Sequence, residues 1–269
     1  MQNMLLASTH HQTGFAWTGL RRLCAVALSL VLVLPMAAQA AGLQISNVLL
    51  EFQPKDTAQG LWLMNTGKTP LRAQARVQQW TQLDGEDMLS PTRVLAASPP
   101  MVEVAPGQQQ FIRVVRLQPE VPAKEQAFRL LIDELPADES TATGVQFLVR
   151  HAVPLFVLPQ AGQALGGRRG ITDQAALTVQ LLPSLTTDAQ LEVHNTGSQR
   201  VRISELVLVD TQDKKTVLIP GLLGYALAGE KMRWPLKLTA EQWRMGGKLT
   251  ARLNDDPELQ SIATIPAMP

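Results

Sequence analysis

The sequence predicts an all-β protein built from two β-sandwich domains. Apolar residues recur with period two over strand lengths in nearly every patterned stretch, and turn formers separate these stretches. Short strands at such spacing are typical of sandwiches. A composition change at 160–170 divides the strands into two groups, which indicates two domains joined by a linker.

Residues 1–40 have the pattern of a cleaved secretory signal. Two arginines at 21–22 precede an apolar stretch, and the segment ends in the small-residue pattern Ala-Gln-Ala at 38–40. A retained anchor helix is the alternative, but Pro35 and the cleavage pattern follow the apolar stretch directly. We therefore expect cleavage before Ala41 and export of the mature chain.

Removing this signal changes the cysteine count and the charge. The only cysteine, Cys24, leaves with it, so the mature chain has no disulfide and depends on core packing. The 24 basic residues fall by two to 22, against 23 acidic residues. This near-neutral balance argues against nucleic acid as a partner.

Strands are expected on both sides of the linker. Before it they are 61–65, 72–80, 109–117, 127–135 and 145–153, and after it 176–182, 190–195, 200–210 and 248–253. One helical turn is expected near 239–244, where a threonine can cap it.

The triplet Asn-Thr-Gly occurs at 65–67 and again at 195–197, each time between two predicted strands. We expect the same turn at both places, with glycine supplying a positive φ. A repeated hairpin implies two sandwiches of related design, although two triplets alone can also arise by coincidence.

Residues for catalysis or metal binding are sparse. His151 and His194 are the only histidines after cleavage and fall in different predicted domains, so no metal site is expected. Asp133 and Glu134 are adjacent and would face opposite sides of a strand. A glycine-arginine run at 166–169 could cradle an anion, but a flexible linker is the plainer interpretation. We expect no cofactor and no enzymatic activity, with catalytic groups assembled from distant loops as the open alternative.

The stretch 144–159 does not fit a self-contained domain. Val145, Phe147 and Val149 form an apolar row on one parity, and Leu148 adds apolar surface on the other. One interpretation is a central strand that is buried on both sides. The other is a strand that lends one row of side chains to another protein.

Arg129 and Arg150 are candidates for binding a carboxylate. If the loop 136–144 closes a symmetric hairpin, these arginines face each other with no nearby acid on that face. Two guanidinium groups would bind a partner's chain terminus well. The alternative is that they extend into water, and the hairpin register is an assumption.

Four segments resemble the periplasmic chaperones of the chaperone-usher pathway, which fold pilus subunits and deliver them to an outer-membrane usher. The segments are SPPMVEVAPGQQQFIRV (98–114), AFRLLIDELP (127–136), VPLFVLP (153–159) and HNTGSQRVRISEL (194–206). Their order and spacing carry the resemblance, which covers nearly the whole mature chain.

The resemblance implies two immunoglobulin-like sandwiches in an angled, boomerang-like arrangement, at 41–159 and 171–269. In this family the chaperone's donor strand completes the subunit's unfinished sheet. It corresponds here to 145–153, with Val145, Phe147 and Val149 as the donor residues. Pilus subunits and an usher are the implied partners. A self-capping oligomer of the free chaperone is a separate hypothesis, because an exposed apolar edge favours pairing.

The chain departs from the family's best-known branch at two positions. A lysine and an arginine that anchor the subunit's C-terminal carboxylate there correspond to Pro154 and Leu49, which cannot bind an anion. The pattern is similar to the archaic or alternative branch, with Arg129 and Arg150 as anchor candidates. A secreted two-sandwich protein of another class, either a pilus subunit or a carbohydrate-active enzyme, is the alternative.

Overall fold

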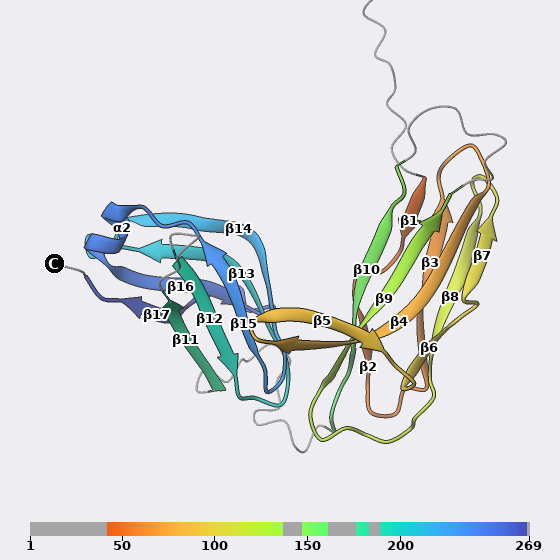
Figure 1. The fold of residues 1–269 in the computed structure, drawn as a ribbon, viewed down its shortest axis with the longest axis horizontal. Helices are drawn as coiled ribbons and strands as arrows, with labels where there is room; N and C mark the ends of the chain where they lie inside the picture. The colour runs from red at the N-terminus through yellow and green to blue at the C-terminus, as the bar shows by residue number, and fades with distance from the viewer. Residues whose placement is uncertain (1–41, 137–146, 161–175, 183–188, 268–269) are drawn as a thin grey trace, which may run out of the picture. The chain divides into compact units, whose positions relative to one another are not determined.

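The computed structural model describes residues 42–136, 147–160, 176–182 and 189–267. Almost all regular structure in these residues is β, in four sheets (Figure 1). Residues 1–41 lie outside the described part, and with them the predicted signal. The predicted linker also lies outside it, except for Gln160.

The first sandwich consists of two sheets. One has the strand order β1 (Leu43–Ile45), β3 (Ala58–Asn65), β8 (Gln109–Arg116) and β6 (Leu95–Ser98). The other has the order β2 (Leu50–Phe52), β10 (Arg150–Val157), β9 (Gln126–Leu135), β4 (Leu71–Leu83) and β5 (Glu86–Pro91), with β7 (Met101–Val104) paired to β4.

The inward rows of these two sheets form one apolar core. Leu61 and Ile112 from the first sheet are fully buried in the same cluster as Phe128 and Leu155 from the second. Alternation along each strand therefore places one face in the core, as the period-two pattern predicts.

The second sandwich has its own pair of sheets and its own core. One sheet has the order β11 (Leu177–Leu182), β12 (Ala189–Asn195) and β15 (Lys231–Leu236), and the other β14 (Lys215–Ala226), β13 (Val201–Val209), β16 (Gly247–Leu253) and β17 (Leu259–Ile265). The predicted helical turn is confirmed as α2 (Ala240–Met245). Thr239 and Gln242 form a reciprocal capping box at its start.

The repeated Asn-Thr-Gly triplet makes the same hydrogen bonds in both sandwiches. Asn65 is buried, and its side-chain amide donates to the carbonyls of Thr69 and Val104 at 2.8 Å each. Its Oδ1 accepts from the Gly67 amide at 2.9 Å. Asn195 repeats the pattern with three corresponding partners, the carbonyls of Gln199 and Ala226 and the amide of Gly197.

The prediction that glycine supplies a positive φ in this turn is wrong. Neither Gly67 nor Gly197 has a positive φ. Glycine fits because a Cβ would lie only 3.1 Å from the Asn65 Oδ1 at Gly67, and 3.0 Å from the Asn195 Oδ1 at Gly197. Close approach to the asparagine side chain is therefore the physical reason for this residue.

Candidate functional site

One row of side chains leads from the core of the first sandwich to the surface, from Val157 of β10 back to Phe147, which lies just before this strand. Val157, Leu155 and Val153 of this row are at most 2% exposed. Val149, on the same parity, is only half-buried, and Phe147 is 83% exposed. The row therefore begins as core and ends as an apolar surface that the described part of the first sandwich leaves uncovered.

The backbone of β10 presents its hydrogen-bonding groups alternately to two edges. The carbonyl of Val149 accepts from the Glu134 amide of β9 at 2.9 Å, whereas the amide of Leu158 donates to Phe52 beside β2 at 2.9 Å. Pairing with β9 continues without a break from Arg150 to Val157. Odd-numbered residues therefore bond to β9, and even-numbered residues point their amides and carbonyls the other way.

The second edge of β10 is only partly occupied. β2 pairs in parallel with Leu155–Val157. Among the described residues, no strand pairs with this edge over 150–154. The Ala152 carbonyl accepts only a long hydrogen bond, 3.4 Å, from the Arg129 side chain. An apolar row and an open strand edge thus lie next to each other, which is the combination that binds an added strand.

The predicted strand 145–153 is shifted in the structure. β10 begins at Arg150 and extends to Val157, and residues 147–149 precede it. Val145 lies outside the described residues. The shift arises because the apolar segment 153–157, which contains a proline, packs its odd residues into the core and so continues the strand.

The predicted pairing of Arg129 with Arg150 is wrong. Arg150 lies opposite Asp133, and Arg129 lies opposite Pro154, four positions further along β10. This register places opposite charges across the strand pair and removes the like-charge contact. The register differs from the predicted one by an even number of residues, so Arg129 and Arg150 still lie on the same face of the sheet, as predicted.

Both arginines have acidic partners, contrary to the prediction. Arg150 forms an ion pair with the 13% exposed side chain of Asp133, and Arg76 of β4 contacts the same carboxylate at 2.9 Å. One aspartate therefore faces two guanidinium groups. Arg76 was not predicted as part of this cluster, because it is 57 residues from Asp133 in the sequence and comes near it only through the pairing of β4 with β9.

Arg129 has a different environment. Its guanidinium lies 3.7 Å from the centroid of the Trp80 ring, and Asp87 is 4.0 Å away. Burial lowers the pKa of Arg129 from its ordinary value, and Asp87 and Tyr225 oppose this change. The side chain is 19% exposed, so its guanidinium packs against the Trp80 ring and is not fully solvated.

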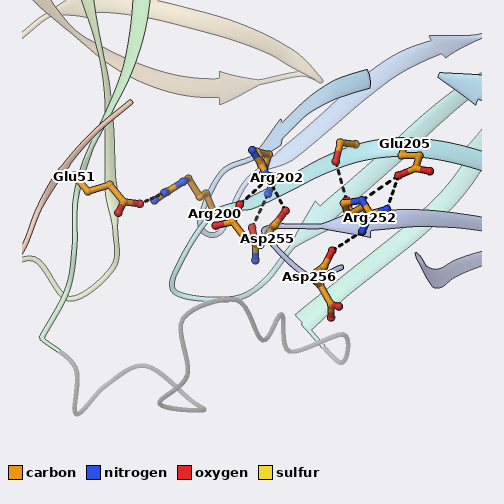
Figure 2. Close-up of polar contacts among 9 residues, drawn as sticks. Glu51, Arg200, Arg202, Glu205, Arg252, Asp255 and Asp256 are labelled. Carbon is orange, nitrogen blue, oxygen red and sulfur yellow. Dashed lines mark hydrogen bonds and ion pairs between the residues drawn. The ribbon is translucent and has the colours of Figure 1, made fainter. Parts of the chain in front are cut away.

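A second arginine cluster joins residues of the two sandwiches. Arg200 contacts Glu125 at 2.6 Å and forms an ion pair with Glu51, while its guanidinium lies 3.6 Å from the Phe156 ring centroid. Figure 2 shows the Glu51–Arg200 pair together with the exposed pair of Arg202 and Asp255. Burial raises the pKa of Glu125, and Arg200 opposes the shift.

The described residues contain no group of three or more histidine, cysteine or acidic side chains that could hold a metal ion. None of the helices in that part of the chain is long and apolar enough to cross a bilayer.

Residues 42–163 match the family described as "Pili and flagellar-assembly chaperone, PapD N-terminal domain". No curated protein matches the sequence. The family match covers the first sandwich, including β10 and its open edge.

Solved structures share the fold over both sandwiches. A chain of the CsuC–CsuE chaperone–tip adhesion subunit complex, from archaic Csu pili of Acinetobacter baumannii, is 23% identical with a TM-score of 0.61. The match covers 85% of this chain and 100% of that one. The CupB2 chaperone of Pseudomonas aeruginosa is 18% identical with a TM-score of 0.52, over 83% of this chain and 100% of its own.

A third structure, the SafA pilin with the SafB chaperone of Salmonella enterica, contains a chain that is 14% identical with a TM-score of 0.52. That match covers 84% of this chain and 97% of the other. At these identities the likeness shows the fold, which confirms the prediction of two immunoglobulin-like sandwiches. Residues 42–163, which form the first sandwich, therefore match the N-terminal domain of the pili and flagellar-assembly chaperones.

Proposed function

We propose that this protein is a periplasmic chaperone that binds pilus subunits by lending them a strand. Val145, Phe147 and Val149 are the donor residues that fill the gap in the subunit's sheet. The observation that carries the proposal is the apolar row that passes from the core, along β10, to the 83% exposed Phe147 just before this strand, beside an open strand edge. Solvent exposure of such a large apolar side chain is costly unless a partner covers it.

The roles of the chain segments follow from this proposal. Residues 1–40 are a cleaved signal that directs export into the periplasm of a Gram-negative bacterium. Residues 41–159 form the domain that holds the subunit, 160–170 form the linker, and 171–269 form the second domain. The chaperone delivers its subunit to an outer-membrane usher and acts without enzymatic activity or a cofactor.

Arg129 and Arg150 remain our candidates for anchoring the subunit's C-terminal carboxylate, now for a different reason. Both lie on the face of the sheet opposite the core, and Arg150 is 61% exposed next to the donor row. Since Arg150 and Arg76 share a single aspartate, this part of the face has a surplus positive charge. A carboxylate from a partner would complete the charge balance.

In the free chaperone, the same apolar row has no subunit to cover it. We propose that a second copy covers it by self-association, because an exposed apolar edge favours pairing. Sedimentation that shows only monomer at every concentration would remove this part of the proposal without affecting the donor role.

The proposal is tested by co-expression with a pilin-like subunit from the same bacterium. Phe147→Asp should abolish co-purification of the subunit, because a carboxylate cannot enter an apolar groove. Leu148→Asp is the matched control, since Leu148 is 50% exposed and on the opposite parity. Equal loss in both variants, or intact binding by Phe147→Asp, would contradict the assigned row.

A further inference from the structure

The edge of β10 that faces away from β9 is occupied on one side of Pro154 and open on the other. From Leu155 onwards the chain's own β2 occupies this edge, and over 150–154 no described strand does. Figure 1 shows β2 as a short strand beside one end of β10. Pro154 is the residue at which the occupied part ends.

Pro154 occupies the position of the next hydrogen bond in the parallel ladder between β2 and β10. Leu158 donates its amide to the carbonyl of Phe52, and the two strands are parallel in register. In a parallel ladder each further bond lies two residues back on both strands. The step after Leu50 would therefore join the amide of residue 154 to the carbonyl of Val48. Proline has no amide hydrogen, so this bond cannot form.

The chain ahead of β2 leaves the edge at this point. Val48 is 74% exposed and Leu49 is 39% exposed, and neither belongs to a strand. The preceding strand, β1, pairs with β3 in the opposite sheet. The N-terminal segment therefore crosses between sheets where Pro154 ends its ladder with β10.

Pro154 does not weaken the pairing of β10 with β9 on its other edge. Even-numbered residues of β10 direct their amides away from β9, so the ladder with β9 loses no hydrogen bond at Pro154. A proline at 153 or 155 would remove a bond to a buried strand.

We propose that Pro154 stops β2 from extending along β10 and so keeps the edge at Arg150–Ala152 open for a partner strand. Pro154 is thus a positioning residue that sets the limit between the chain's own strand and the added one. This inference rests on the proposed function, because it takes the open edge to be the subunit's site.

The test begins with the free chaperone, and therefore needs no subunit. In Pro154→Ala, the new amide at 154 should pair with the Val48 carbonyl. Amide hydrogen exchange measured by NMR should then be about tenfold or more slower at 154 than at 150 and 152. Exchange at 154 as fast as at 150 and 152 would overturn the proposal, whatever the protein binds.

The second measurement uses a pilin-like subunit that co-purifies with the wild-type chaperone. Pro154→Ala should capture it several-fold more slowly than the wild-type chaperone, because the extended β2 must first leave the edge. Pro235→Ala is the control, since Pro235 is an exposed proline of β15, in the second sandwich, and should leave capture unchanged. Protection at 154 together with unchanged capture would also overturn the proposal.

Discussion

Asn65 and Asn195 are buried at equivalent turns of the two sandwiches, and each makes the same three hydrogen bonds with its side chain. Replacing either with alanine leaves two carbonyls and a glycine amide without their partner. We expect Asn65→Ala and Asn195→Ala each to lower the free energy of unfolding by about 1–3 kcal/mol. Urea denaturation of the purified variants measures this loss.

Asn47→Ala is the control for these asparagine variants. Asn47 is exposed and makes one long hydrogen bond, 3.4 Å, to the Gly60 carbonyl. Its replacement should change the free energy of unfolding by no more than about 0.5 kcal/mol. An equal loss at Asn47 and Asn65 would mean that the buried network is not what stabilises the turn.

The period-two pattern predicted the strands that alternate between core and solvent. β3, β4, β8 and β9 lie where the sequence places them. β3 and β8 alternate buried with exposed residues, β4 alternates with a change of parity between Ala75 and Trp80, and β9 is apolar over most of its length. Two of the strands that were missed have no such pattern. β5 is exposed at every position, and β2 has only three residues, so neither has a usable alternation.

The candidate site was predicted in part. The parity of Phe147 and Val149 follows from alternation alone and does not depend on the hairpin register. The partners of Arg129 and Arg150 do depend on the register, which the sequence of the connecting loop does not specify. Asp133 was therefore missed as the partner of Arg150, although an acid on the preceding strand was the available signal.

Removing the two anchor candidates should weaken subunit capture. If they are desolvated in the complex, we expect the double variant Arg129→Ala and Arg150→Ala to lose about 2–5 kcal/mol of binding free energy. Calorimetry with a purified subunit, or its displacement from the complex, measures this change. Arg113→Ala removes one exposed positive charge from the opposite sheet and shows the effect of losing such a charge outside the candidate anchor. Normal capture by the double variant would place the anchors elsewhere.

Successive amides of β10 point to opposite edges of the strand. Proline substitutions at two neighbouring positions should therefore affect different properties, subunit binding at one and chaperone stability at the other. Ala152→Pro removes an amide from the open edge, so the subunit complex should weaken by about 1–3 kcal/mol while the chaperone stays within about 1 kcal/mol of its stability. His151→Pro removes an amide from the ladder with β9 and should instead destabilise the chaperone itself. Thermal unfolding and subunit capture, measured on both variants, separate the two effects. Loss of chaperone stability in both would mean that the edges are not assigned correctly.

Arg200 compensates a buried acid, and its removal should produce a defect that depends on pH. The side chain of Glu125 is 2% exposed and that of Arg200 is 13% exposed, so Arg200→Met leaves a buried carboxylate without its main partner. We expect a loss of about 3–5 kcal/mol near neutral pH. Burial already raises the pKa of Glu125, and loss of Arg200 raises it further. The folded variant then holds a proton that the unfolded chain releases, so its stability falls as the pH rises through this window. The defect should therefore shrink in acid, as measured by denaturant unfolding across the pH range.

Arg202→Met is the control, because Arg202 is 38% exposed and its partner Asp255 is 88% exposed, and a solvent-screened pair of this kind contributes about 0–1 kcal/mol at most. A defect of the same size at every pH would show that Arg200 acts through packing on Phe156 and not through the charge of Glu125.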